Sequence, residues 1–164
     1  MEEKTIKKIV KKTVKTEEKK SKPEGKLLVI IRITGQVNLR PGVNECLYRL
    51  RLRRKFACVL MNSDNRDTMG MLEQVKFFVA YGNISKETLA KLINARGQKV
   101  DGKKFNGEDV AEELMNGKSL SDLGFKPFFR LHPPRKGIHS KLQYPKGVLG
   151  NHKDDINKLV ERML

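Results

Sequence analysis

The sequence predicts an α+β fold, with a β-α-β-α-β core over residues 27–82 and a helical, basic-loop extension packed on it over residues 83–164. Three observations lead to this prediction: short apolar runs with the composition of buried strands, amphipathic stripes of helical period between them, and a later region rich in turns and basic residues. Each of the two helices in the core has one apolar stripe to bury. We therefore expect both to cover one face of a small sheet.

The first strand and helix lie in residues 27–50. Residues 27–33 read LLVIIRI, a continuous run rich in β-branched residues that is typical of a buried strand. After a polar loop, Pro41 suits the first turn of a helix, where its missing N–H is not needed. The next apolar residues recur at the spacing of one helical face: Val43, Cys46, Leu47 and Leu50.

The rest of the core follows in residues 56–82. FACVLMN, residues 56–62, predicts the second strand, and Asp67 is expected to cap the second helix at its N-terminus. The apolar face of that helix comprises Met71, Leu72, Val75, Phe78 and Val79. FVAYG, residues 78–82, predicts a short third strand. The pattern alone leaves the directions of the strands open.

Three helices are expected in the extension. Ser85 is predicted to cap the first of them, SKETLAKLINAR. A short acidic helix, EDVAEELMNG, contains Glu112 and Glu113, which we interpret as solvated surface residues rather than a pair of catalytic acids. DDINKLVERML closes the chain with a third amphipathic helix, whose apolar face comprises Ile156, Leu159, Val160 and Met163.

The charge of the chain is large and unevenly distributed. Lys and Arg number 35 against 19 Asp and Glu, a net charge of +16, and almost all of the excess lies in residues 1–26, 27–55 and 125–147. Such a charge predicts an acidic partner, nucleic acid being the commonest and an anionic membrane surface the main alternative. No apolar run approaches the roughly 18 residues of a membrane span, and the N-terminus lacks the apolar region of a secretory signal. We therefore expect a cytoplasmic protein, with Cys46 and Cys58 reduced inside apolar stretches.

The N-terminal tail, residues 1–26, carries ten Lys and five Glu around a thin apolar stripe. Such a segment buries too little apolar surface to offset its ordering entropy. Two interpretations stay open, a disordered solvated tail or an arm that becomes helical on an acidic partner.

The segment RLHPPRKGIH, residues 130–139, raises the choice between a metal or catalytic site and a rigid loop that grips phosphate. A zinc site needs three or four converging ligands, and His132 and His139 have no neighbouring Cys, Asp or Glu. Two prolines stiffen the loop, and arginine can hold two phosphate oxygens at once. We predict an RNA-binding loop with no metal, cofactor or catalytic group. Phe128 and Phe129 precede it, either as stacking platforms or as anchors in the core.

The residues expected to bind RNA come from two of the basic blocks. They are Arg40, Arg49, Arg51, Arg53, Arg54, Lys55, Arg130, His132, Arg135, Lys136, His139 and Lys141. Low aromatic content and the absence of Trp favour a reader of folded RNA by charge and shape over a binder of single strands.

Five stretches in this order resemble a known family: RITGQVNLRPGVNECLYRLRL, DNRDTMGMLEQVKFFVAYG, SKETLAKLINARG, FRLHPPRKGIH and GNHKDDINKLVERML. The chain is similar over residues 27–164 to the large-subunit ribosomal protein family L-thirty/L-seven, in its long archaeal and eukaryotic form. The resemblance implies a small antiparallel three-stranded sheet with two helices on one face. It also implies a structural, non-enzymatic role on large-subunit ribosomal RNA beside neighbouring ribosomal proteins, with no membrane and no small-molecule substrate.

Two other functions are weighed against this one. A protein that binds DNA or chromatin needs a reading helix, for which PGVNECLYRLRLRR is the only candidate, and it lacks a helix-turn-helix partner of the usual spacing. An RNA-processing enzyme that uses His132 and His139 is the second alternative.

Overall fold

The computed structural model describes residues 27–100, 102 and 105–164. Both interpretations of the lysine-rich tail concern residues 1–26, which lie outside the described part of the chain. The division of the chain at residues 26 and 82 stays a prediction. None of the helices in the described ranges is long and apolar enough to cross a membrane.

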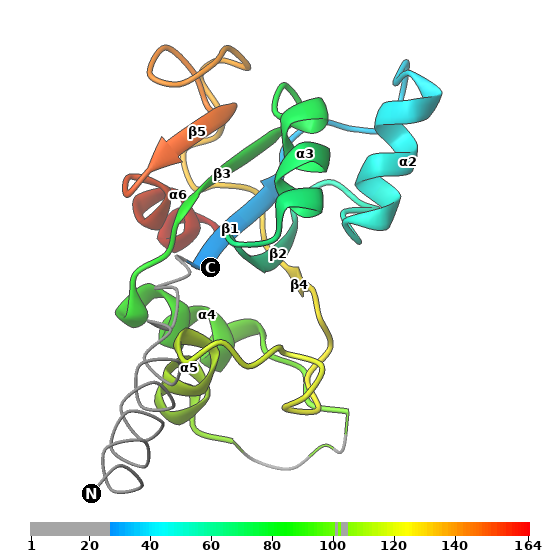
Figure 1. The fold of residues 1–164 in the computed structure, drawn as a ribbon. Helices are drawn as coiled ribbons and strands as arrows, with labels where there is room; N and C mark the ends of the chain where they lie inside the picture. The colour runs from blue at the N-terminus through cyan, green and yellow to red at the C-terminus, as the bar shows by residue number, and fades with distance from the viewer. Residues whose placement is uncertain (1–26, 101, 103–104) are drawn as a thin grey trace, which may run out of the picture.

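A five-stranded mixed sheet forms the centre of the fold, in the order β4-β2-β1-β3-β5 (Figure 1). β1 pairs antiparallel with both β2 and β3, which gives the three-stranded arrangement that the resemblance implied. β4 then extends the β2 side antiparallel, and β5 extends the β3 side in parallel. The strands are β1 (Leu27–Arg32), β2 (Ala57–Asn62), β3 (Val79–Asn83), β4 (Phe129–Arg130) and β5 (Gly150–Lys153).

Sequence analysis missed the two outer strands. β4 has two residues and β5 has four, and β5 reads GNHK, so neither has a detectable alternation of apolar and polar residues. They exist because neighbouring strands offer free edges with which they pair. The three expected strands therefore account for only the middle of the sheet.

Helices cover both faces of the sheet (Figure 1). On one face lie α2 (Pro41–Arg49) and α3 (Arg66–Val75), as predicted. On the other lie α4 (Lys86–Arg96), α5 (Gly107–Met115) and α6 (Ile156–Met163). In β1, Ile30 packs toward the first pair of helices, whereas Val29 and Ile31 pack toward the second group. β1 is apolar from Leu27 to Ile31 because both of its faces are covered.

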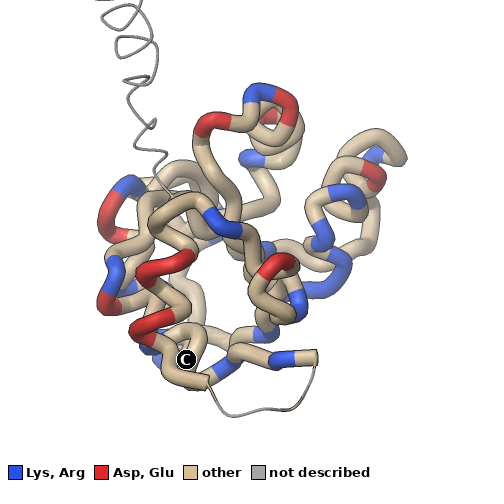
Figure 2. Tube along the Cα trace, turned by 60° about the horizontal axis from the view of Figure 1, so that its bottom comes forward, with Lys and Arg blue, Asp and Glu red and all other residues tan. Residues whose placement is uncertain are grey.

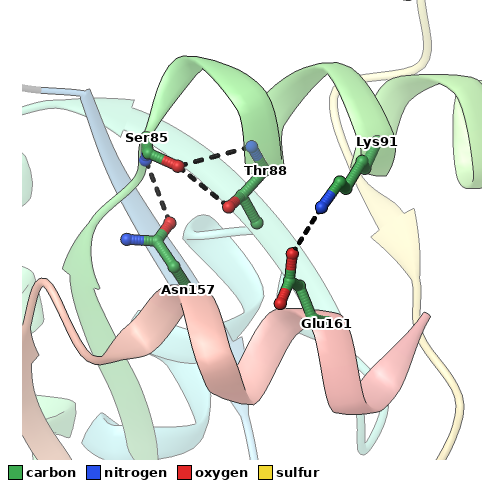
Figure 3. A network of polar contacts seen from close by, with 5 residues as sticks. All are labelled: Ser85, Thr88, Lys91, Asn157 and Glu161. Carbon is green, nitrogen blue, oxygen red and sulfur yellow. Dashed lines mark hydrogen bonds and ion pairs between the residues drawn. The ribbon is translucent and has the colours of Figure 1, made fainter.

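Polar contacts fix the ends of two of these helices (Figure 3). The predicted cap at Ser85 is confirmed, because its hydroxyl accepts a hydrogen bond from the Thr88 N–H at 3.3 Å. The backbone N–H of Ser85 in turn donates to Asn157 Oδ1 on α6 at 2.9 Å. One turn further along, Lys91 and Glu161 form an ion pair at 2.7 Å. The start of α4 is thus joined to α6.

Two details of the core differ from expectation. The prediction that Asp67 caps α3 was wrong, since the helix begins at Arg66 with Asn65 at the cap position. Asp67 lies in the first turn, where its carboxylate still suits the positive end of the helix dipole. Both cysteines are free, but only Cys58 is fully buried, and burial raises the pKa of its thiol. Cys46 is half-buried and donates to Gln74 Oε1.

The close approach of β3 to β5 can be tested with one glycine substitution and a matched control in α3. A Cβ at Gly82 would lie 2.2 Å from the Lys153 carbonyl oxygen and 3.0 Å from Ile156 Cβ. We expect Gly82→Ala to lower the free energy of unfolding by about 1–3 kcal/mol, the usual cost of overpacking. The matched control is Gly70→Ala, at an exposed position in α3 with no atom within 4 Å of the new Cβ. It should raise stability by about 0.5–1 kcal/mol, because alanine favours the helix. Denaturant titration measures both changes, and a neutral Gly82→Ala would contradict the observed packing.

Candidate nucleic-acid interface

A basic hollow of about 580 Å³ lies beside the β4 edge of the sheet. Five exposed cations surround it, and no acidic residue of the described part of the chain lines it. Figure 2 shows the same imbalance along the chain at α2 and the segment after it, marked blue at several places and red at one. The residues that line the basic hollow are Arg51, Arg53, Arg54, Lys55, Ala57, Phe128, Arg130 and Leu131.

Strand pairing brings two separate basic blocks together at this hollow. Residues 51–55 belong to the block 27–55, called the first block from here on, and Arg130 belongs to the block 125–147, called the second block. β4 pairs with the start of β2 so that Arg130 lies opposite Ala57, and the Leu131 N–H donates to the Phe56 carbonyl at 3.0 Å. Arg130 therefore stands next to the 51–55 segment although more than seventy residues separate them along the chain.

The backbone hydrogen bonds at the C-terminal end of α2 set the direction of the chain through residues 51 and 52. The Arg51 N–H donates to the Tyr48 carbonyl at 3.0 Å, and the Leu52 N–H donates to the Leu47 carbonyl at 2.8 Å. These two bonds form a Schellman motif, and the apolar contact that usually accompanies one is supplied by the fully buried Leu47 and Leu52. Arg51 occupies the left-handed position of the motif with φ of 60°, where glycine is the common residue. The chain thus holds an arginine where local backbone preference disfavours one.

Hydrogen bonds from a buried guanidinium also hold the 51–55 segment. Arg32, at the end of β1, is fully buried and donates to the carbonyls of Leu52 at 2.6 Å and Arg53 at 3.2 Å. It also donates to the carbonyls of Thr34 at 3.0 Å and Gly35 at 2.8 Å. Burial lowers the pKa of the guanidinium, but an arginine remains charged in proteins and needs these acceptors. Arg32 therefore ties two loops into one structure.

Further contacts hold the side chain of Arg53 and the backbone of Arg53 and Arg54. The guanidinium of Arg53 stacks over the ring of Tyr48, 4.1 Å from its centre, and Gln36 donates to the Arg53 carbonyl. The Ala57 N–H donates to the Arg54 carbonyl at 3.1 Å, which closes the turn into β2. An arginine that is stacked before a ligand arrives loses less conformational entropy when it binds.

The loop after β4 docks on the C-terminal end of α6. The His132 N–H donates to the Met163 carbonyl and the Arg135 N–H to the Arg162 carbonyl, both at 2.9 Å. The Arg162 guanidinium donates back to the carbonyls of Arg135 at 2.8 Å and Gly137 at 3.0 Å. The last carbonyls of a helix otherwise lack partners, so the loop supplies donors to α6 and Arg162 of α6 supplies donors to the loop. Its outward side chains His132, Arg135 and Lys136 are exposed.

His139 lies apart from the basic hollow. It lines a second cavity of about 420 Å³ between the 134–148 loop and α6, together with His152 and Asp155. Within this cavity Tyr144 donates to Asp155 at 2.6 Å and Lys158 donates to Asp155 at 2.8 Å. The bonds from Lys158 and Tyr144 lower the pKa of Asp155, and the bond to Asp155 raises the pKa of Tyr144. In the described ranges, no group of three or more His, Cys, Asp or Glu is arranged to hold a metal ion.

The structure does not gather the remaining predicted residues at the basic hollow. Arg40 occupies the N-cap position of α2, at the opposite end of the helix from Arg51. Arg49 pairs with Glu45 at 2.6 Å, and Lys141 is exposed in the loop after His139. Of the twelve predicted residues, five therefore surround the basic hollow, namely Arg51, Arg53, Arg54, Lys55 and Arg130.

The acidic helix α5 lies against α4. Its Glu112 pairs with Lys86 on α4 at 2.6 Å, and this bond lowers the pKa of the Glu112 carboxyl. Glu113 pairs with Lys118 at 3.3 Å. Neither carboxylate lines the basic hollow. The two are thus separate surface ion pairs rather than a catalytic pair.

Two features escaped the sequence analysis. Arg32 was read only as part of an apolar strand, although a lone charge inside such a run is itself a signal, since a buried charge needs partners. The two phenylalanines were treated as a pair, whereas the structure separates them. Phe129 is buried in the core, and Phe128 is half-buried and lines the basic hollow.

Comparison with known proteins identifies the family of this chain. Residues 28–79 match the family described as ribosomal protein L30p/L7e. Large ribosomal subunit protein uL30 of Archaeoglobus fulgidus is 40% identical over 152 residues, which cover 84% of this chain and 99% of that protein. The proteins of the same name from Ignicoccus hospitalis and Desulfurococcus amylolyticus are 36% and 38% identical, over 85% of this chain and 98% and 99% of their own lengths. The chain therefore belongs to the uL30 family of large ribosomal subunit proteins.

Proposed function

We propose that this protein is a structural, non-enzymatic constituent of the large ribosomal subunit that binds ribosomal RNA through its basic surfaces. The observation that carries the proposal is the basic hollow, where cations from two blocks converge and the described lining residues include no acid. Phosphate neutralisation by such groups supplies most of the affinity for nucleic acid. Its partners are ribosomal RNA and neighbouring ribosomal proteins on cytoplasmic ribosomes, without a cofactor, a membrane or a small-molecule substrate.

The loop over residues 130–139 contributes a second RNA contact in this proposal. Its backbone is tied to α6, and Lys136 has a left-handed φ of 66° that turns the chain before Gly137. Arg135, Lys136, His139 and Lys141 then contact RNA beside α6, whereas Arg130 contacts it at the basic hollow. The acidic helix α5 faces away from RNA, because carboxylates near phosphates raise the energy of binding.

Neither alternative function is favoured by a specific observation. A helix-turn-helix reader needs two helices joined by a short turn, but strand β2 separates α2 from α3. An RNA-processing enzyme needs His132 and His139 to converge on one phosphate. His139 lines the cavity beside α6, and His132 is not among the residues that line it. Sedimentation of lysate with and without RNase tests the choice, since RNase-insensitive association with DNA would overturn the ribosomal proposal.

Salt dependence tests the electrostatic part of the proposal. We expect the affinity for a large-subunit RNA fragment to fall steeply with salt. Replacement by glutamine of any one of the five cations around the basic hollow, here called rim cations, should reduce the slope of log K against log salt by about 0.9. Lys86→Gln is the matched control, because this ammonium is paired with Glu112 on the acidic helix. Fluorescence anisotropy from low to high salt measures the slopes. A flat response for the unmodified protein would refute RNA binding through basic surfaces.

Arg51 offers a test that separates binding from folding. Arg51→Gly relieves the left-handed backbone at φ of 60° and should raise the free energy of unfolding by roughly 1 kcal/mol. The same change removes a rim cation and should weaken RNA binding several-fold. Thermal melting and anisotropy on the same sample measure both effects. A variant that gains stability and keeps full affinity would show that Arg51 does not contact RNA.

A further inference from the structure

We propose that the basic hollow receives a single unpaired nucleotide, with its base on the apolar floor and its phosphates at the cationic rim. This inference rests on the proposed function, because it assumes that the partner is RNA. It adds the form of RNA that this site prefers, namely a bulged or otherwise extruded residue rather than a continuous duplex.

The floor of the hollow is apolar and partly aromatic. Ala57 and Leu131 retain only 6% and 7% of their accessible surface, so both are firmly packed, and the half-buried Phe128 lines the same hollow. Pure phosphate binding needs no such floor, because a phosphate is fully hydrated and gains nothing from apolar contact. An unpaired base gains from contact with both aliphatic and aromatic groups, and its face stacks on phenylalanine.

The size of the hollow suits a nucleotide. Sites that enclose small organic ligands have volumes of about 300–1,000 Å³, and this one has about 580 Å³. The regular backbone of a duplex contacts a protein mainly along its outer surface, with its bases stacked inside. A base can enter a concave site of this kind only if it leaves the stack.

The rim matches the charge of the same ligand. Arg51, Arg53, Arg54 and Lys55 come from the segment between α2 and β2, and Arg130 reaches the hollow from β4. The Arg130 guanidinium also lies 5.9 Å from the centre of the Phe128 ring. A planar guanidinium and a phenyl ring at the same site can contact a base and its phosphate together. The described residues that line the hollow include no carboxylate to repel that phosphate.

The segment that carries the rim is rigid before RNA arrives. Arg32 holds the carbonyls of Leu52 and Arg53, and the Schellman motif at the end of α2 fixes the direction of Arg51. A preformed site favours a ligand of defined shape, since little ordering entropy remains to be lost.

Three RNA hairpins with the same stem test the inference on the full chain. One is fully paired, one has a single unpaired adenosine in the stem, and one has an abasic residue at that position. The adenosine-bulged hairpin should bind five- to hundredfold tighter than the paired one, the range expected for one stacked base. The abasic hairpin should lose most of that gain, because it keeps the flexible backbone but has no base to place on the floor.

A pair of matched phenylalanine variants locates the effect. Phe128→Leu should lower the ratio of affinities for bulged over paired RNA, because leucine keeps apolar volume but not the aromatic face. Phe77→Leu should leave the ratio unchanged. Phe77 also lies beside a cation, with Lys76 5.5 Å from its ring centre, but on the segment after α3 and outside the hollow. Thermal melting confirms that each variant folds.

The unmodified protein alone can overturn the inference. Equal binding of the three hairpins, or an abasic hairpin as tight as the adenosine bulge, would exclude a nucleotide pocket even if salt dependence stays steep. That result would leave the proposed function standing. A flat salt response for all three hairpins would instead refute RNA binding itself, so failure of the inference and failure of the proposed function are distinguishable.

Discussion

The buried guanidinium of Arg32 is the interaction on which the basic surface depends. It lies at the end of the central strand, fully enclosed, and its partners are four backbone carbonyls rather than a carboxylate. Removing a charge from water is costly unless hydrogen bonds replace the lost hydration. The carbonyls that satisfy Arg32 belong to the two loops that flank the sheet end, so satisfying the charge and ordering the loops are one event. A neutral core residue at this position would remove the hydrogen bonds that join the carbonyls of Leu52 and Arg53 to β1.

Completion of the sheet by late segments has an equally direct consequence. β4 and β5 come from the part of the chain after residue 125, yet they pair with β2 and β3 from the core. The pairing of β4 places Arg130 beside the first basic block. The chain that follows β4 then reaches the end of α6, where its N–H groups satisfy the last carbonyls of that helix. Two residues of strand thus determine where both parts of the second basic block lie.

Much of this fold was predictable from local pattern, and the convergence of the site was not. The apolar faces of α2 and α6 and the cap at Ser85 follow from periodicity and capping chemistry, which act over a few neighbouring residues. The predicted apolar face of α3 was too long, because the helix ends at Val75, Phe78 follows it and Val79 belongs to β3. The resemblance in the core and the C-terminal stretches identified the family correctly. The basic hollow depends on the register of Ala57 opposite Arg130, a long-range pairing with no local signature. The separate places of Phe128 and Phe129 depend on the same register, because Phe129 pairs with Cys58 inside β4 and is buried, whereas Phe128 precedes the strand.

The arrangement of charges and backbone around the hollow lowers the stability of the free protein. Like charges that lie near one another repel, and five cations share this site with no acid among the described residues that line it. Arg51 adds a left-handed backbone that glycine would adopt without strain. Carboxylates are available elsewhere on the molecule, at Glu112 and Glu113, but they pair with lysines on and beside α4 and α5. A fold selected only for stability would combine these charges. Their separation is understandable if the missing negative charge is supplied by an RNA partner, whose phosphates convert the repulsion into binding energy.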